Sequence, residues 1–274
     1  LFLIDCGEGC QLQLRRRNFS FLKIQNIFIS HIHGDHIFGL FGLLSSMSLI
    51  GRTEDIYIYG PAQLKKVLDF IVETFGDQFK FKIVHNVLSM KSPQIIFETK
   101  SIEVLAFRLN HRIECFGFIF REKMPKRNIY KEKVDELSLT LKEIASLKNS
   151  SDVVREEGEV LCYEKLTYLP YNPRSFAYCS DTAPFNELPE YIKDVSMLYH
   201  EATFMEDMEK MAKETFHSTA SQAAEIALKA GVKRLILGHF SSRYNNLSPL
   251  LKEAKAIFPE SYLAEEGTEI EVPF

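Results

Sequence analysis

The sequence has few cysteines for its length and no pair of them at CxxC spacing. Among 274 residues there are five cysteines, an odd number without the regular spacing of a disulfide framework. They are Cys6, Cys10, Cys115, Cys162 and Cys179. This pattern argues against both a disulfide-stapled fold and a cysteine-based zinc site, so a metal site would have to use histidine and carboxylate ligands.

A long hydrophobic run is also missing. No apolar stretch approaches the roughly 20 residues that a membrane span requires, and the N-terminus lacks the basic, apolar and small-residue order of a signal peptide. With 46% hydrophobic and 26% charged residues, the composition is that of an ordinary globular protein, and we expect a soluble cytoplasmic one. Because the chain enters an apolar strand at Leu1 without a methionine, we expect that an N-terminal segment is missing.

Strong charge of one sign is absent as well. A formal net charge of −4 provides no overall attraction to nucleic acid, so a nucleic-acid substrate would need local basic patches. One such patch is the run of three arginines at residues 15–17, at the end of a helix predicted over residues 11–17. A run of this kind is either a solvated face or a phosphate contact.

What the sequence does contain is a concentrated cluster of potential metal ligands at residues 30–36, Ser-His-Ile-His-Gly-Asp-His. Three of the eight histidines of the chain fall here beside an aspartate. The apolar run at residues 27–29 predicts a short buried strand before the cluster, and residues 37–44 predict the opening of a buried helix after it. The cluster is therefore expected on a rigid turn between strand and helix.

The spacing within the cluster suits two neighbouring metal ions better than one. His31 and His33 are two residues apart on an extended loop, so both can point at the same ion. The adjacent Asp35 and His36 can reach a second ion. Further ligands must come from elsewhere in the chain, because a closed site needs more than these.

Strand and helix patterns alternate through most of the chain. Strands are expected over residues 1–4, 56–59, 80–87, 94–97, 102–110, 115–120, 175–179, 196–199 and 233–238, with a last strand reaching residue 272. Helices are expected over residues 62–75, 217–231 and 248–258. The strands from residue 80 to residue 110 alternate as in a meander, and His85 within them is interpreted as structural.

Several predicted strands end on a polar residue that could join the cluster. These are His111 after residues 102–110, Asp181 after residues 175–179, and His239 after residues 233–238. Side chains at strand ends commonly line an active site. The helix beginning near His217 has Thr219 and Gln222 in capping-box spacing and Gly231 as its stop.

Residues 121–174 interrupt this pattern. They are charged and proline-containing, with one helix predicted near residues 134–147, and the strand pattern resumes at Ser175. We interpret this segment as an excursion from the main domain.

The sequence HxHxDH, followed by a histidine, an aspartate and a histidine at strand ends, resembles the metallo-β-lactamase superfamily. The segments DCGEG at 5–9, HEATF at 200–204, HST at 217–219 and GHFSSRY at 238–244 are, with residues 30–36, similar to the ribonuclease Z family of tRNA 3′-processing endonucleases. The resemblance covers nearly the whole chain. It implies an α/β fold, an αββα sandwich of metallo-β-lactamase type forming a single domain over residues 1–274, with an arm inserted at residues 121–174.

The resemblance also implies roles for individual residues. Two zinc ions would be held by His31, His33 and His111 on one side, by Asp35, His36 and His239 on the other, and by Asp181 as the bridge. Asp35 would in addition orient the attacking water and accept its proton. His217 would act as a general acid positioned by Glu201; the alternative is a purely structural pair at a capped helix. The same ligand types also suit manganese, iron or cobalt.

The implied substrate is precursor tRNA, cut after the discriminator nucleotide, and the implied assembly is a homodimer whose arm grips the tRNA bound to the other subunit. The Gly-Pro-rich motif typical of that arm is absent here. Phosphate contacts are expected from Arg15, Arg16, Lys126 and Arg127, with affinity that falls steeply as salt rises. Two other functions fit the sequence less well: a zinc phosphodiesterase acting on a small molecule or another nucleic acid, and a metal-bound RNA-binding scaffold without chemistry.

Overall fold

Two β-sheets packed face to face form the body of the molecule in the computed structural model, which describes residues 1–76 and 79–274. The first sheet is parallel and has the order β1-β2-β3-β4. Its strands are β1 (Phe2–Ile4), β2 (Asn26–Phe28), β3 (Ile56–Pro61) and β4 (Ile83–Leu88). Parallel strands align their carboxyl ends at one edge, which positions the loop after β2 there.

The second sheet is mixed and has the order β15-β14-β13-β12-β7-β6-β5. Its strands are β5 (Gln94–Glu98), β6 (Ile102–Arg108), β7 (Phe116–Glu122), β12 (Ser175–Cys179), β13 (Met197–Glu201), β14 (Leu235–Gly238) and β15 (Ser261–Leu263). Strands β5 to β7 form an antiparallel meander, β12 continues it, and β12 to β15 run parallel.

An aromatic core fills the space between the two sheets. Phe28 of β2 stacks on Tyr59 of β3 at 4.9 Å between ring centroids, and it also contacts Phe118 of β7 at 5.5 Å. All three side chains are buried in one cluster. Aromatic rings at these separations add packing specificity to the large apolar area that they bury.

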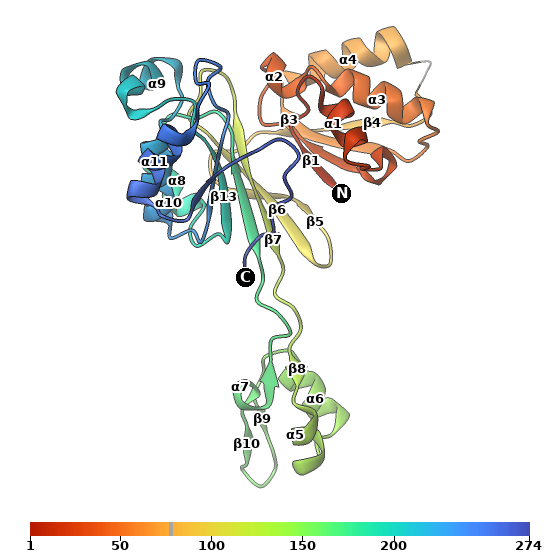
Figure 1. The fold of residues 1–274 in the computed structure, drawn as a ribbon. Helices are drawn as coiled ribbons and strands as arrows, with labels where there is room; N and C mark the ends of the chain where they lie inside the picture. The colour runs from red at the N-terminus through yellow and green to blue at the C-terminus, as the bar shows by residue number, and fades with distance from the viewer. Residues whose placement is uncertain (77–78) are drawn as a thin grey trace.

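Helices cover the outer face of each sheet (Figure 1). The helices beside the first sheet are α1 (Cys10–Arg16), α2 (Gly34–Ile37), α3 (Leu40–Leu49) and α4 (Leu64–Phe75). Those beside the second are α8 (Leu188–Tyr191), α9 (Glu209–Thr215), α10 (Ala220–Ala230) and α11 (Ser248–Ile257). The arrangement is the predicted αββα sandwich.

The predicted capping of α10 is present. Gln222 N donates to Thr219 Oγ1 at 3.2 Å, and Thr219 N donates to Gln222 Oε1 at 3.0 Å. The helix ends at Gly231, which has a φ of 66°, a left-handed conformation that glycine adopts without steric cost.

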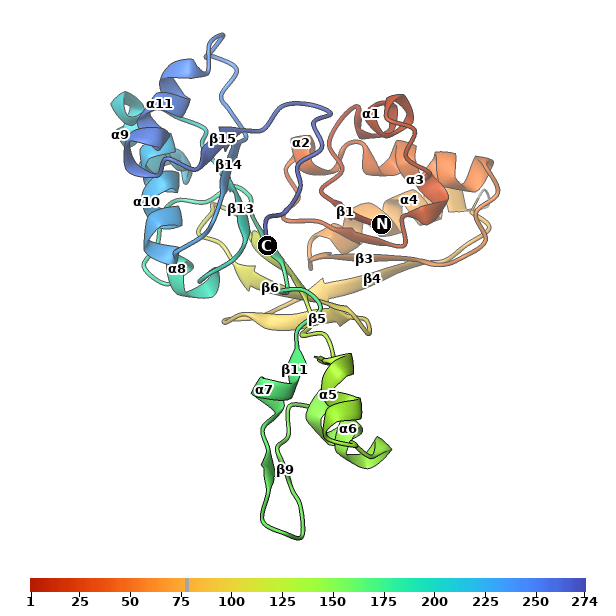
Figure 2. The same ribbon diagram turned by 60° about the horizontal axis from the view of Figure 1, so that its bottom comes forward.

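Between β7 and β12 the chain leaves the sandwich as an arm, residues 123–174, that projects from the body on two extended segments (Figures 1 and 2). It contains β8 (Asn128–Ile129), α5 (Lys131–Glu136), α6 (Leu141–Lys148), β9 (Val153–Val154), β10 (Val160–Leu161), α7 (Tyr163–Leu166) and β11 (Thr167–Tyr168). Leu139, Leu147, Leu161 and Leu166 form a buried cluster of their own. The arm thus has an apolar core separate from those of the body.

The structure corrects four expectations about local elements. The single helix expected from residue 37 is instead two helices, α2 and α3, separated at residues 38–39. The single helix expected over residues 134–147 is also two helices, α5 and α6, because the capping box at Thr140 begins a new helix. Strand β4 lies parallel to β3 in the first sheet, outside the meander. The last strand ends at Leu263, because residues 264–274 run as irregular chain rather than pairing with the sheet.

None of the helices within residues 1–76 and 79–274 is long and apolar enough to cross a membrane.

The meander leaves no room for a side chain at position 117. A Cβ atom at Gly117 would collide with the ring of Phe107 and lie 3.0 Å from Tyr178 O. We expect Gly117→Ala to lower the free energy of unfolding by about 1–3 kcal/mol, as overpacking does. Denaturant unfolding measures this, with Gly42→Ala as the control: its Cβ would meet only the flexible Gln11 side chain at 3.2 Å, so a comparable loss there would contradict the steric reason.

Candidate metal centre

All seven predicted ligands gather where the ends of the two sheets meet. The loop after β2 carries His31 and His33, and α2 carries Asp35 and His36. The second sheet contributes one residue from each of three strand ends, after β6, β12 and β14; these are His111, Asp181 and His239. The described residues include three overlapping groups whose ligand atoms lie within 4.8 Å of one another and could hold a metal ion, and the first two consist only of predicted ligands.

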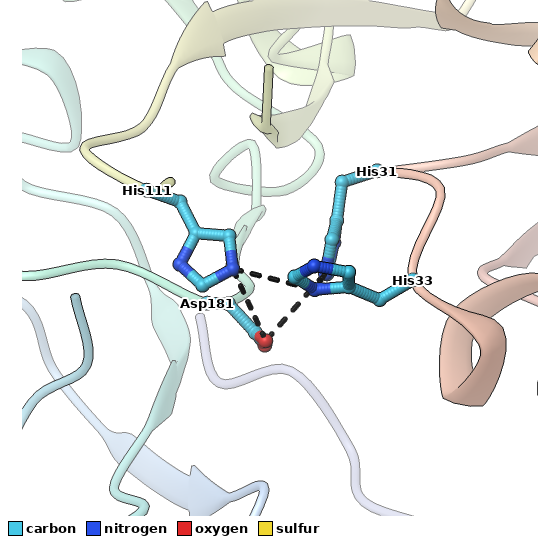
Figure 3. A group of neighbouring side chains, drawn as sticks. All are labelled: His31, His33, His111 and Asp181. Carbon is cyan, nitrogen blue, oxygen red and sulfur yellow. Dashed lines mark hydrogen bonds and ion pairs between the residues drawn. The ribbon is translucent and has the colours of Figure 1, made fainter. Parts of the chain in front are cut away.

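The first group consists of three histidine nitrogens and one carboxylate oxygen (Figure 3). His31 Nε2 lies 2.9 Å from His33 Nδ1, which lies 3.4 Å from His111 Nε2. Asp181 Oδ2 is 3.5 Å from His31 Nε2 and 3.9 Å from His111 Nε2. All four atoms lie within 4.8 Å of one another.

The second group consists of Asp35, His36 and His239, and it faces the other oxygen of the same aspartate. His36 Nε2 and His239 Nε2 lie 3.5 Å and 3.3 Å from Asp181 Oδ1. Asp35 Oδ2 is 3.5 Å from each of these two nitrogens. Asp181 therefore presents one carboxylate oxygen to each group.

The dimensions of both groups fit a tetrahedrally coordinated metal. Metal–nitrogen bonds of about 2.0–2.1 Å place neighbouring tetrahedral ligands ~3.3 Å apart, close to the observed separations. His36 Nε2 is buried and has no hydrogen-bond partner among the described residues. Because a buried polar atom normally has a partner, a metal ion accounts for this orphaned nitrogen, and neutral imidazole with carboxylate suits zinc or a similar divalent ion.

Hydrogen bonds fix the ring orientation of four of the histidines. In each case the nitrogen that does not face the group has an oxygen partner: His31 Nδ1 lies 3.0 Å from Ser30 Oγ, His36 Nδ1 2.8 Å from Asp5 Oδ2, His111 Nδ1 3.0 Å from Phe216 O and His239 Nδ1 2.9 Å from Thr203 Oγ1. Such outer partners fix the tautomer and hold the ligands of a metal in position.

The electrostatics of the cluster favour cations. Burial, together with the neighbouring histidines, lowers the pKa of His31 to about 2, so it stays neutral. Burial lowers the pKa of His239 by itself, but hydrogen bonding to Asp35 and the negative charges of Asp181 and Glu201 outweigh it and raise the pKa to about 9. The same bond from His239 lowers the pKa of Asp35 and keeps that carboxylate ionised.

A buried carboxylate–histidine pair lies beside the two groups. Glu201, the last residue of β13, is fully buried and accepts four hydrogen bonds: from Thr182 N and Thr203 N, each at 3.0 Å, from Thr203 Oγ1 at 2.7 Å, and from His217 Nδ1 at 2.8 Å. Burial alone would raise its pKa, but the bond from His217 leads the contributions that lower it. The carboxylate is thus ionised and fully satisfied.

The position of His217 allows two interpretations. Its ring stacks against that of His239, with centroids 5.5 Å apart and a 17° angle between planes. Since Nδ1 contacts Glu201, Nε2 is the nitrogen left for substrate. His217 also forms a third group of potential metal ligands with Asp181 and His239, so the metal content of a His217 variant separates an acid from a ligand.

The four predicted phosphate-contacting residues lie outside the cluster. Arg15 and Arg16 occupy the last turn of α1 and are exposed, as is Lys126 in the arm. Arg127 is used within the arm: Nε donates to Thr167 Oγ1 at 2.6 Å and the guanidinium lies over the ring of Tyr163. His85, interpreted as structural, belongs to none of the ligand groups.

Sequence reasoning missed the residues that hold the ligands in place. Asp5 was expected only as part of a turn, yet it accepts from Ser30 N at 2.7 Å, Ser30 Oγ at 2.8 Å and Tyr178 Oη at 3.0 Å, besides contacting His36. Thr203 links Glu201 to His239 in the same way. Their positions in the sequence could have indicated this role. Asp5 directly follows the strand predicted over residues 1–4, and Thr203 lies shortly after the strand predicted over residues 196–199.

Comparisons with known proteins agree with this geometry. A family model described as anti-Pycsar protein Apyc1 matches residues 1–132, and one described as a beta-lactamase superfamily domain matches residues 136–240. The chain is 45% identical to ribonuclease Z of Bacteroides fragilis (strain YCH46) over 97% of its own length and 88% of the relative. It is 42% identical to ribonuclease Z of Cytophaga hutchinsonii over 97% and 85% of the two chains.

Among solved structures, the human tRNase Z, short form, is similar with a TM-score of 0.70 and 27% sequence identity. The match covers 100% of this chain and 88% of the human one. A long-form RNase Z from yeast has a TM-score of 0.65 at 18% identity, which supports the fold alone. The metallo-β-lactamase type of sandwich predicted from the sequence is confirmed.

Proposed function

Since the chain belongs to the ribonuclease Z family, we propose that it is a metal-dependent endoribonuclease that removes the 3′ trailer from precursor tRNA. It hydrolyses the phosphodiester after the discriminator nucleotide and leaves a 3′-hydroxyl. The observation that carries the proposal is the pair of ligand groups joined by Asp181, with the His217–Glu201 pair beside them. Such a substrate is consistent with a cytoplasmic enzyme.

In this proposal the site takes two zinc ions per chain. His31, His33 and His111 would hold one, Asp35, His36 and His239 would hold the other, and Asp181 would be shared between them. Two divalent ions at such a site lower the pKa of water toward neutrality and neutralise charge on the phosphoryl oxygens. The outer partners Asp5, Ser30 and Thr203 keep the ligands in that arrangement.

The residues of the chain supply the proton transfers. Asp35 is ionised and 65% of its side chain is exposed, so it can orient the attacking water and accept its proton. His217 gives a proton from Nε2 to the departing 3′-oxygen of the ribose. Glu201 holds His217 through Nδ1 and stabilises the charged imidazolium, as a buried carboxylate beside a catalytic histidine does.

The direct test is to incubate the zinc-loaded protein with a 3′-extended precursor tRNA and map the cut at single-nucleotide resolution, with a chelator control. A chelator-sensitive cut after the discriminator is expected. Turnover of a small phosphodiester without any cut in the tRNA would overturn the proposal and favour a phosphodiesterase.

We further propose that the arm contacts the body of the tRNA and that the protein works as a homodimer, with the arm of one subunit reaching the tRNA on the other. The projection of the arm away from the body supports this (Figure 1), as does the exposure of Lys126. Light scattering of the purified protein tests the dimer.

Excision of the arm should separate tRNA binding from chemistry. Because the arm has its own apolar core, replacing residues 124–172 by a short glycine–serine linker should leave the sandwich folded. We expect unchanged hydrolysis of a small phosphodiester but a KM for precursor tRNA raised by about tenfold or more, because lost phosphate contacts reduce counterion release. An equal loss on both substrates would contradict this role for the arm.

The outer partner Asp5 should matter for metal affinity. Asp5→Asn replaces one carboxylate oxygen by an NH2 group, which cannot accept the hydrogen bonds that Ser30, His36 and Tyr178 make to Asp5. We expect metal affinity to fall about 10–100-fold, as for other partners of metal-bound histidines. Competition with a chromogenic chelator measures this. Glu8→Gln is the matched control, because it makes the same change on an exposed residue of the same turn; an equal effect there would refute a specific role for Asp5.

A further inference from the structure

A cavity of about 370 Å³ lies against His217, on the side of α9 and α10. Its walls come from four segments: Asn110 in the loop between β6 and β7, Pro184 after β12, Lys213 and Phe216 at the end of α9, and Gln222 in α10. The volume falls within the range of about 300–1,000 Å³ that is typical of small-ligand sites. Because His217 lines this cavity and also adjoins the metal centre, whatever binds there lies next to the reaction.

Phe216 is held in this wall in an unusual conformation. It follows α9 with a φ of 61° and a ψ of 46°, the left-handed region that a bulky residue rarely occupies. Its carbonyl accepts the bond from His111 Nδ1 at 3.0 Å, and its side chain is 37% exposed. A strained backbone that presents a ring to a cavity beside catalytic groups is typical of a functional position.

The polar groups around the ring are available to a ligand. The Asn110 side-chain amide has no hydrogen bond, and Lys213 has no ion pair, in the part of the chain that the structure describes. Glu209, also in the wall, accepts from Gln222 Nε2 at 3.1 Å and keeps further lone pairs. An aromatic face with donors and acceptors at its edge is the usual means of binding an unpaired nucleobase.

The position of His217 identifies which base this would be. His217 gives its proton to the 3′-oxygen that leaves, and that oxygen belongs to the ribose of the discriminator nucleotide. The base on the same ribose must therefore lie on the His217 side of the site, where the cavity is. Resting on the function proposed above, we propose that this cavity binds the base of the discriminator nucleotide, with Phe216 as its stacking platform.

The test compares Phe216→Gly with the wild-type enzyme on intact precursor tRNA and on the same tRNA with an abasic discriminator. Glycine adopts the left-handed conformation freely and keeps the carbonyl that holds His111, so the variant should fold and retain its metal. A stacked base contributes roughly 5- to 150-fold in affinity. On the intact tRNA, we expect the variant to have a kcat/KM lower than that of the wild type by a factor within this range. On the abasic tRNA, we expect the two enzymes to have the same kcat/KM.

Two further variants, and a tRNA whose first trailer nucleotide is abasic, make the result specific. Lys213→Ala should show the same dependence on the discriminator base, and Phe70→Ala, which removes a ring 62% exposed on the distant helix α4, should have no effect. A loss of kcat/KM in Phe216→Gly, relative to the wild type, that is equal on intact and abasic tRNA would show a structural role and overturn the proposal.

A loss of kcat/KM that disappears only when the first trailer nucleotide is abasic would also overturn the proposal, because it would assign the cavity to the base of the trailer. If the wild type cuts no precursor tRNA, the proposed function fails, and this assignment fails with it.

Discussion

Asp181→Asn should reduce cleavage of precursor tRNA by about a thousandfold or more, since metal stabilisation of the transition state contributes several kcal/mol. Asp181 presents Oδ2 to the group of His31 and His111 and Oδ1 to the group of His36 and His239. Asparagine keeps the shape but loses the charge and one of the two acceptor oxygens. The metal content should therefore fall below that of the wild-type protein.

Metal analysis by mass spectrometry and single-turnover kinetics measure the two effects together. Asp69→Asn is the matched control, because the Asp69 side chain, on α4, is 49% exposed and pairs with Lys65, and the same change there should alter neither quantity. If Asp181→Asn retained both its metal and its cleavage rate, Asp181 would not be the bridging residue.

His217→Ala should slow cleavage by about 10²–10⁴-fold, the usual contribution of a general acid, while the metal content stays at the wild-type level. The leaving 3′-oxygen of a ribose is a poor leaving group without a proton. A p-nitrophenyl phosphodiester should be much less affected, because p-nitrophenolate departs without protonation. Glu201→Gln should show the same pattern more weakly, since it removes the charge that stabilises the imidazolium.

The two substrates distinguish an acid from a metal ligand. His217 lies near enough to Asp181 and His239 to hold a metal with them, and a ligand variant would lose metal and activity on both substrates alike. Loss of metal in His217→Ala would therefore contradict the assigned role. Thr215→Ala serves as a control, because among residues 1–76 and 79–274 its hydroxyl bonds only to Met211 O at 2.7 Å and Ala212 O at 3.3 Å, both within α9.

The sequence by itself determined the types of the predicted ligands and their places on the elements. The cluster at residues 30–36 follows a short apolar run, and each further ligand follows a strand whose pattern is local. The capping box of α10 and its glycine stop depend on Gln222 and Gly231, three and twelve positions after Thr219, so they too were predictable. Local periodicity is sufficient for features of this kind.

Only the tertiary structure decided which side chains meet and what holds them. Asp5 and Tyr178 are 173 positions apart, and their hydrogen bond exists only because the two sheets pack face to face. The parallel pairing of β4 with β3 and the break between α5 and α6 were likewise settled by partners and caps rather than by periodicity. The cavity beside His217 is formed by four separate segments, and no local pattern encodes a space that arises only when distant segments pack together.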